Sequence, residues 1–291
     1  MSKPMLDSSI TSVKTQDIKQ VVKDRYGKCA ETGSRGSPCC AGKAIASLSF
    51  AAEHGLYSQE ELSLVPELAR SLSKGCGNPV GFANLQPGEV VVDFGCGAGI
   101  DVILAARKVG PSGKVFGVDF APQMIERVKQ AVTEAGLSDT VKLVVADMEA
   151  LDLPDGFADV VISNCVINLC PDKDAVYREV FRILKPGGRL AISDIVYLEK
   201  VNPQVLERFR STWAGCVGGS IDQESYFEIV NEAGFTRLET VARHPLPPKE
   251  LEEMACCPGP EFTPVPTKED LAVVQDKVIS IKFTASKPEL G

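Results

Sequence analysis

One short segment constrains the fold of this 291-residue chain more than any other feature of its sequence. The apolar run Val90-Val91-Val92 is followed by Asp93, by glycines at 95, 97 and 99, and then by helical spacing of apolar residues over 100–109. A continuous β-branched run is typical of a strand buried on both faces of a parallel sheet. Glycines permit a tight turn and let a ligand approach the backbone without a Cβ in the way. The segment therefore predicts a nucleotide-like ligand at the carboxyl end of a central strand.

Strand and helix patterns alternate from Glu89 to Asp194. Further strands are expected over residues 115–118, 141–145, 158–162 and 190–193, and helices over 122–136 and 173–184. This alternation implies right-handed crossovers and therefore an α/β fold with a doubly wound, mostly parallel sheet. Outside this core, helices are expected near residues 15–27, 43–54, 58–72, 203–213 and 222–233, and strands near 236–242 and 277–285.

The chain divides into three predicted parts. A break rich in glycine precedes the first core strand, and the regular alternation loosens after Asp194. We expect an N-terminal helical segment with a cysteine-containing loop over residues 1–75 and a cofactor-binding core over 76–198. A smaller C-terminal α+β domain over residues 199–291 is expected to contribute to the substrate site and cap it.

Acidic residues at the ends of the next two strands also suit a nucleoside ligand. Asp119 is placed to hold both ribose hydroxyls, whereas Asp147 can accept from an adenine amino group and Met148 can pack on the ring. Helix capping is the alternative role for the two acids. The candidate cofactor-binding residues are Asp93, Gly95, Cys96, Gly97, Gly99, Asp119, Phe120, Asp147, Met148 and Asn164.

Together these features resemble the class I S-adenosylmethionine-dependent methyltransferases over the core strands and helices. The turn Leu184-Lys185-Pro186-Gly187-Gly188 before the fifth strand belongs to the same resemblance. It implies a Rossmann-like fold and S-adenosylmethionine as cofactor. A pyridine-nucleotide domain is the alternative, but that fold prefers the spacing Gly-x-Gly-x-x-Gly, whereas here a glycine recurs at every second position.

The charge and hydropathy of the chain exclude some partners. The formal net charge of −8 argues against nucleic acid, because neutralising phosphates needs a basic face. No segment approaches the ~18 consecutive apolar residues of a membrane span, and Met1 to Lys23 carries no apolar run typical of a signal peptide. We therefore expect a cytoplasmic protein without a membrane or nucleic-acid partner.

Ten cysteines are unusual for such a chain, and they are too dilute for a disulfide scaffold. Cys165 follows the fourth strand, at the edge of the sheet where such folds bind ligands. The glycine-flanked Cys216 lies on a segment that could fold back over the same opening, and Cys76, also between glycines, precedes the first strand. Three thiolates around one crevice would make a soft site for trivalent arsenic, or for zinc if a fourth ligand joined.

The scarcity of histidine supports arsenic as the acceptor. Methylation of oxygen or nitrogen often needs a general base, yet the chain holds only His54 and His244, neither of them within the core. Carboxylate or tyrosine bases remain alternatives. Trivalent arsenic has a lone pair and no proton to lose, so alignment and exclusion of water would suffice for methyl transfer.

Several segments then resemble the arsenite methyltransferases over most of the chain up to about residue 245. The most specific is Ser163-Asn164-Cys165-Val166-Ile167-Asn168-Leu169; the others are Tyr26-Gly27, Gly75-Cys76-Gly77, Asp93-Phe94-Gly95-Cys96-Gly97, Pro171-Asp172-Lys173 and Cys216-Val217-Gly218-Gly219. The resemblance implies methylation of arsenite, with methylarsenite as a further candidate substrate and with Cys165 and Cys216 as arsenic ligands. It also implies that Cys76 binds arsenic or resolves a disulfide.

The family also uses a thiol reductant of the glutathione or thioredoxin type and an N-terminal cysteine for thiol exchange. Spacing from Tyr26-Gly27 favours the doublet Cys39-Cys40 for this relay, with Cys29 as the other possibility. Cys256-Cys257 lies beyond the matched region and is either an arsenic-capturing pair or without a role. Cys96 and Cys170 are interpreted as packing residues, because free cysteine is often simply a small buried hydrophobe.

Two other functions compete with arsenite methylation. One is a methyltransferase of the same fold that acts on a small organic carbon or oxygen, which leaves the placement of the three cysteines unexplained. The other is a thiol-rich protein that sequesters arsenic or a metal without turnover.

Overall fold

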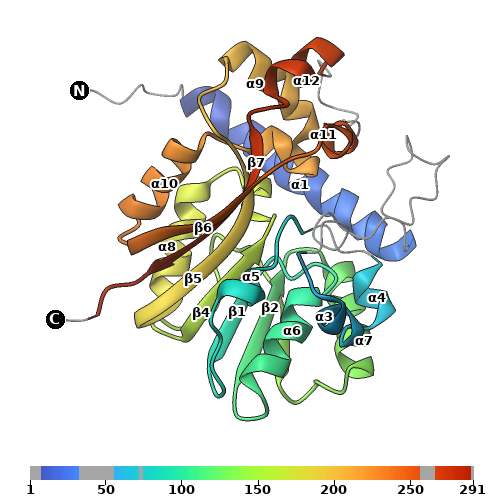
Figure 1. Cartoon of the computed structure of the whole chain (residues 1–291), viewed down its shortest axis with the longest axis vertical. Coiled ribbons are helices and arrows are strands. Elements are labelled where there is room, and N and C mark those ends of the chain that lie inside the picture. Colours follow the sequence, from blue (N-terminus) through green and yellow to red (C-terminus); the bar gives the residue numbers. More distant parts are fainter. Residues whose placement is uncertain (1–7, 33–55, 72–74, 256–265, 290–291) are drawn as a thin grey trace.

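The computed structural model describes residues 8–32, 56–71, 75–255 and 266–289. Seven strands form one mixed sheet in the order β3-β2-β1-β4-β5-β7-β6 (Figure 1). They are β1 (Val90–Phe94), β2 (Lys114–Asp119), β3 (Val141–Val145), β4 (Ala158–Asn164), β5 (Leu184–Tyr197), β6 (Thr236–Pro245) and β7 (Val278–Ser286). The first five are parallel, whereas β7 is antiparallel to both β5 and β6. The predicted doubly wound, mostly parallel sheet is confirmed.

Helices cover both faces of the sheet, because successive residues of the central strands point to opposite sides. Val91 packs with α6 (Ile100–Val109) and α7 (Pro122–Glu134), whereas Val92 packs with α8 (Lys173–Ile183) and α10 (Gln223–Glu232). The three core helices predicted from the sequence therefore lie where expected. The remaining helices are α1 (Ser8–Thr32), α3 (Gln59–Ser63), α4 (Glu67–Arg70), α5 (Pro79–Phe82), α9 (Pro203–Phe209), α11 (Pro248–Ala255) and α12 (Lys268–Val274), with the short 3₁₀ segments η2 (Ile167–Leu169), η3 (Arg210–Gly215) and η4 (Val217–Gly219).

Two details differ from the sequence prediction. The single helix expected over residues 58–72 is broken into α3 and α4, because Pro66 lacks the amide proton that a continuous helix would need at this point. The helix expected over 203–213 is divided into α9 and η3, with a kink at Thr212. The helix expected over 43–54 lies outside the described residues.

The C-terminal part of the chain extends the core sheet. β7 pairs along β5 from Arg189 to Tyr197, and β6 pairs with β7 at the outer edge. The helices α9, α11 and α12 gather at one end of the sheet, where the long helix α1 also crosses (Figure 1). Among the described residues, none of the helices has the length and apolar character needed to cross a bilayer.

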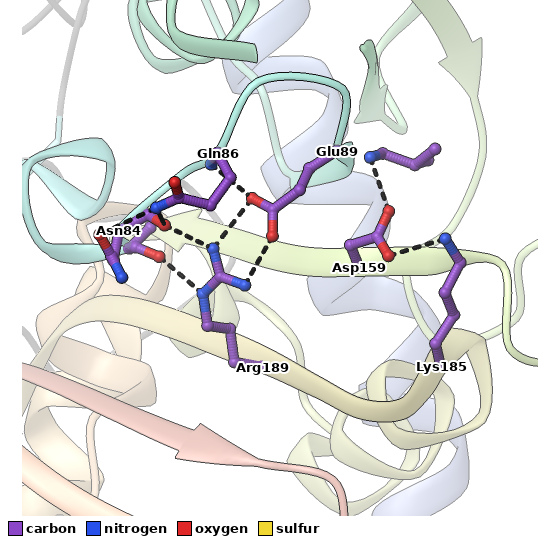
Figure 2. Close-up of polar contacts among 8 residues, drawn as sticks. Asn84, Gln86, Glu89, Asp159, Lys185 and Arg189 are labelled. Atoms are coloured by element: carbon purple, nitrogen blue, oxygen red, sulfur yellow. Dashed lines mark hydrogen bonds and ion pairs between the residues drawn. The ribbon is translucent and has the colours of Figure 1, made fainter.

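A polar network ties together the amino ends of three neighbouring strands (Figure 2). Arg189 of β5 forms an ion pair with Glu89 before β1, with Nη1 2.8 Å from Oε1, and donates from Nε to the carbonyl oxygen of Ala83 at 2.7 Å. Asp159 of β4 accepts from the backbone N–H of Val90 at 2.8 Å and from Lys185 Nζ at 2.7 Å. The amino ends of these strands are engaged in structural contacts, and the ligand-binding features lie at the carboxyl ends of the strands.

Candidate active site

The glycine loop between β1 and α6 has the backbone that its sequence predicts. Gly95, Gly97 and Gly99 have φ values of 75°, 48° and 94°, which lie in the left-handed region that favours glycine. A Cβ on Gly95 would collide with the side chain of Val166, so this glycine is required by packing. A Cβ on Gly97 would meet no protein atom closer than 3.9 Å among the described residues. The space beside Gly97 is therefore open to a ligand.

A cavity extends from this loop to Cys165. Its other lining residues come from α1, α6, α7, the end of β4 and the segment before α5: Tyr26, Gly75, Ile100, Asp101, Met124, Asn164 and Val166, together with loop residues 95–99. Among the described residues that line it, Asp101 is the only charged one. The Asp101 carboxylate accepts from Tyr57 Oη at 2.8 Å and from Asn164 Nδ2 at 2.9 Å. Burial raises the pKa of Asp101 to about 6, although these two hydrogen bonds act in the opposite direction.

Two further buried carboxylates lie beside the loop. Burial, with the nearby Asp101 and Asp119, raises the pKa of Asp93 well above its usual range, and Asp93 Oδ2 has no hydrogen-bond partner among the described residues. Asp119 accepts from the backbone N–H of Gly97 at 3.1 Å and of Ala121 at 2.9 Å. Burial raises its pKa to about 6 against these bonds. Above about pH 6, Asp101 in the cavity wall and Asp119 beside the loop are ionised, which gives this region a negative charge that suits a cationic ligand.

A second cavity lies under helix α1. It is lined by Lys19, Val22, Phe120, Asp147, Met148, Val166, Leu169 and Cys170. The predicted adenine-binding residues Asp147 and Met148 therefore share one cavity with Phe120. Lys19 of α1 forms ion pairs with Asp147 at 2.7 Å and with Glu149 at 2.6 Å. Desolvation would lower the pKa of Lys19, but these two carboxylates raise it above its usual value.

The three predicted arsenic-binding cysteines are brought together. The thiol of Cys165 lies next to those of Cys216 and Cys76, and its interactions with both, together with burial, raise the pKa of Cys165 well above its usual range. Cys216 Sγ also donates to the carbonyl oxygen of Cys165 at 3.1 Å. All three side chains are buried in one apolar cluster with Leu169, and Tyr26 packs against it. Residues separated by up to 140 positions in the chain thus meet beside the cofactor cavity.

The Gly75-Cys76-Gly77 segment is held between the ends of β4 and β5. A Cβ on Gly75 would collide with the Asn164 side chain, and one on Gly77 would collide with Ser193, so both glycines are needed for this close approach. Asn164 binds both polar groups of Gly77: Nδ2 donates to its carbonyl oxygen at 2.8 Å, and Oδ1 accepts from its N–H at 3.1 Å. The glycines on either side of Cys76 therefore bring its thiol to Cys165.

The thiols do not yet surround a common centre. Among the described residues, no group of three His, Cys, Asp or Glu side chains has the arrangement of a metal site. The Cys216 thiol donates to the carbonyl oxygen of Cys165. A ligand that bonds all three sulfur atoms requires the thiols to rotate, and the zinc alternative gains no support.

The other cysteines fall into two groups. Cys29, Cys96 and Cys170 are buried, and burial raises the pKa of Cys96 and of Cys170 well above their usual range, as expected for packing residues. Cys29 packs on α7 with Met124 and Tyr26. Cys39, Cys40, Cys256 and Cys257 lie outside the described residues, as does His54. His244, on β6, contacts Lys282 Nζ through Nε2 at 3.0 Å.

Sequence reasoning missed three residues that shape the cofactor cavity. Asp101 stands in the first turn of α6, where an acid is common for electrostatic reasons alone. Tyr57 precedes the N-cap of α3 and carries no local signal of its contact with Asp101. Tyr26 was noted only as part of a matching segment, but its ring lines the cavity, and burial together with Cys216 raises the pKa of its phenol well above the usual range.

Comparisons with known proteins agree with this geometry. The model of a methyltransferase domain family matches residues 85–234. An arsenite methyltransferase of Halobacterium salinarum is 36% identical over 77% of this chain and 59% of its own length. A methyltransferase of Streptomyces halstedii is 33% identical over 67% of this chain and 68% of its own length. A crystal structure of an arsenic(III) S-adenosylmethionine methyltransferase from Chlamydomonas reinhardtii has a TM-score of 0.63 and 27% identity, over 80% of this chain and 73% of that one. The chain spans about three fifths of the length of the arsenite methyltransferases that it matches.

Proposed function

Because the chain belongs to the methyltransferase domain family, we propose that it transfers the methyl group of S-adenosylmethionine to trivalent arsenic held by Cys76, Cys165 and Cys216. The observation that carries this proposal is the position of Cys165. This residue lines the cofactor cavity, accepts a hydrogen bond from the Cys216 thiol at its carbonyl oxygen, and is buried in one apolar cluster with Cys76 and Cys216. The likeness to arsenite methyltransferases from an archaeon and from mouse supports the same substrate.

The residues of the two cavities fit S-adenosylmethionine. Asp93 carries a buried carboxylate oxygen without a described partner, and the space beside Gly97 would be filled by a Cβ. We assign Asp119 to the ribose hydroxyls, and Asp147 with Met148 and Phe120 to the adenine ring. Gly95, Cys96, Gly99 and Asn164 line the part of the cavity that leads to Cys165. When bound, the cofactor supplies an electrophilic methyl group on a cationic sulfonium, which suits the negative charge of Asp101 in the cavity wall and of Asp119 beside the loop.

The three cysteines would hold arsenic by exchange. Each As–OH bond of arsenite is replaced by an As–S bond, and the thiol proton leaves with the hydroxide as water. Soft thiolate ligands suit this soft ion, and the product keeps a lone pair on arsenic. No proton has to be removed from arsenic before methyl transfer, so the site needs no general base. The apolar cluster around the thiols would exclude water and align the lone pair with the cavity.

The later steps of the cycle extend the proposal. Methylarsenite, which presents two exchangeable hydroxyls, can bind through two of the three thiols and serve as a second substrate. Cys39 or Cys40 is proposed as the thiol that relays exchange. Methyl transfer to the lone pair raises arsenic to the pentavalent state, and arsenic returns to the trivalent state when two of its thiolates leave as a disulfide. A reductant of the glutathione or thioredoxin type would then reduce that disulfide and restore the thiols. A reducing compartment such as the cytoplasm suits an enzyme that works with free cysteines.

Speciation of arsenic after incubation tests the proposal. The purified protein is incubated with arsenite, methyl-labelled S-adenosylmethionine and either glutathione or a thioredoxin system, and arsenic species are separated by chromatography and detected by mass spectrometry. We expect labelled methylarsenic species and one S-adenosylhomocysteine for each methyl group transferred. Binding of both ligands without a methylated product would contradict the proposal and indicate a sequestering protein.

A further inference from the structure

We propose that the buried lysine Lys173 is a positioning residue, which fixes the Cys216 loop so that its thiol can act as the third arsenic ligand. This inference rests on the proposed function and adds a residue that touches neither arsenic nor cofactor. The Cys216 loop is defined here as residues 213–220, which include η4. Three sets of contacts hold this loop: those of Lys173, and those of its own end residues Trp213 and Ser220.

Lys173 occupies an unfavourable position for a lysine. It is 6% exposed and is the first residue of α8, where the helix dipole disfavours a positive charge. Burial lowers its pKa, although Asp194, Cys170 and Cys216 act in the opposite direction. A buried ammonium group needs partners that repay its desolvation. The contacts that hold this group therefore indicate what the lysine does.

Those contacts lead to the Cys216 loop. Lys173 Nζ donates to the carbonyl oxygen of Gly219 at 2.7 Å and to that of Cys170 at 3.4 Å. The same ammonium lies 5.9 Å from the ring centroid of Trp213. The Lys173 ammonium, at the start of α8, thus contacts Trp213 and Gly219, which lie at or next to the two ends of the Cys216 loop.

Two further hydrogen bonds dock the loop on that segment. Trp213 Nε1 donates to the carbonyl oxygen of Leu169 at 3.1 Å. Ser220 Oγ donates to the carbonyl oxygen of Cys216 at 3.0 Å and accepts from Asn168 Nδ2 at 3.2 Å. Gly219 packs so closely on the Asn168 carbonyl group that a Cβ would not fit.

The backbone of Cys216 requires such support. Its φ of 73° lies in the left-handed region, which is disfavoured for a residue with a Cβ. Residues in such conformations persist only where the surrounding structure enforces them. The Cys216 thiol reaches Cys165 in this conformation, so a loosened loop would withdraw the third ligand and leave Cys76 and Cys165 in place.

Two arsenic compounds with different thiol requirements test the proposal on the full chain. Arsenite exchanges three hydroxyls for three thiolates and releases three waters, whereas phenylarsine oxide takes two thiolates and releases one. Trp213 is the only tryptophan of the chain, so its fluorescence reports binding at this loop. Titrations are run in a phosphine reductant, which carries no competing thiol.

The variants are Lys173→Met and the milder Ser220→Ala, with Lys287→Met as the matched control. Lys287 Nζ also donates to two carbonyl oxygens, of Phe181 at 2.7 Å and Leu184 at 2.8 Å, and lies over the Phe181 ring, but it is remote from the cysteines. In both loop variants we expect arsenite affinity to fall by about tenfold or more, as for other residues that orient a ligand. Phenylarsine oxide affinity should stay within about threefold of wild type, and S-adenosylmethionine affinity should not change.

The possible outcomes separate this inference from the proposed function. Loop variants that bind arsenite as tightly as wild type would overturn the role of Lys173 and leave the proposed function standing. Equal weakening of both arsenicals would also overturn it, because that result indicates a general structural defect. A wild-type protein that binds neither arsenical would contradict the proposed function itself.

Discussion

Cys216 directs its thiol at the carbonyl oxygen of Cys165, with 3.1 Å between Sγ and O. Both residues have positive φ, 73° and 61°, although neither is glycine. Two strained cysteines from separate loops therefore face each other, and one of them, Cys165, lines the cofactor cavity. Strain of this kind is concentrated at functional sites, where the surrounding structure maintains it.

Replacement of Cys216 by serine should separate arsenic chemistry from cofactor binding. A hydroxyl is a poor ligand for soft arsenic, so turnover of arsenite should fall by about a hundredfold or more. Since Cys216 does not line the cofactor cavity, the affinity for S-adenosylmethionine measured by calorimetry should remain that of wild type. Cys216→Ser protein with undiminished methylation would show that the acceptor is held elsewhere.

Two glycines of the cofactor loop should differ in the effect of an added methyl group. Gly97→Ala places its Cβ in the open cavity, so it should abolish measurable cofactor binding while costing only about 1 kcal/mol of stability for its left-handed φ. Gly95→Ala forces its Cβ against Val166, so the free energy of unfolding should fall by about 2 kcal/mol or more. Calorimetry and denaturant unfolding of both variants check the contrast. Equal cofactor affinity in Gly97→Ala and wild type would mean that the ligand does not approach this loop.

Cofactor affinity should decline in mild acid. The pKa values of Asp119 and Asp101 are both about 6, and only an ionised carboxylate can accept at both of its oxygens from the two ribose hydroxyls and attract the sulfonium. Affinity measured by calorimetry should be constant above about pH 7 and fall by about tenfold per pH unit, or more steeply, below about pH 6. Asp119→Asn should bind more weakly at pH 7 and show a shallower fall. A flat profile down to pH 5 would contradict the assignment.

Acid unfolding would not explain that decline. Because the pKa values of these two carboxyls are raised in the folded protein, the folded state binds protons more tightly than the unfolded state between about pH 4 and pH 6. Their contribution to stability therefore increases as pH falls through this window. The pKa of Asp270 is lowered to about 2, chiefly by Arg208, so its ionised form stabilises the folded state. This contribution to stability is lost only as pH falls from about 4 toward 2.

The contacts at the amino ends of the strands should affect the free energy of unfolding without affecting the affinity for the cofactor. Arg189→Met leaves Glu89 and the carbonyl groups of Ala83 and Asn84 without their shared donor, so the free energy of unfolding should fall by about 2–3 kcal/mol. The control is Glu199→Gln, which removes an exposed ion pair with Lys277 and should cost less than about 0.5 kcal/mol. Denaturant unfolding measures both. Loss of cofactor affinity in folded Arg189→Met would contradict the separation of the two ends of the strands.

The sheet and the cofactor loop could be predicted because their signals are local. The β-branched run before Asp93 and the glycine spacing after it specify a buried strand and a tight turn without reference to the rest of the chain. The position of Cys165 followed from topology, since the carboxyl ends of parallel strands meet at one edge. The C-terminal strands were predicted within a few residues, because their alternation of apolar and polar residues is also local.

Contacts between distant segments could not be predicted in this way. Tyr57, Asp101 and Asn164 meet in three dimensions, but each has an ordinary local role as a loop tyrosine, a first-turn acid or a strand-end amide. Lys19 pairs with Asp147 over 128 positions, and Lys173 reaches Gly219 over 46. No periodicity in the sequence encodes such pairs, because they depend on how α1 and the Cys216 loop dock on the finished core.

X-ray absorption at the arsenic edge tests the central claim most directly. The wild-type protein, loaded with one equivalent of arsenite under reducing conditions, should show arsenic bonded to three sulfur atoms and to no oxygen. Cys165→Ser or Cys216→Ser protein should show a mixed sulfur and oxygen shell. An arsenic atom in the wild-type protein that keeps its oxygen neighbours, or that has the same sulfur shell when Cys165 and Cys216 are both serine, would contradict the three-thiol site.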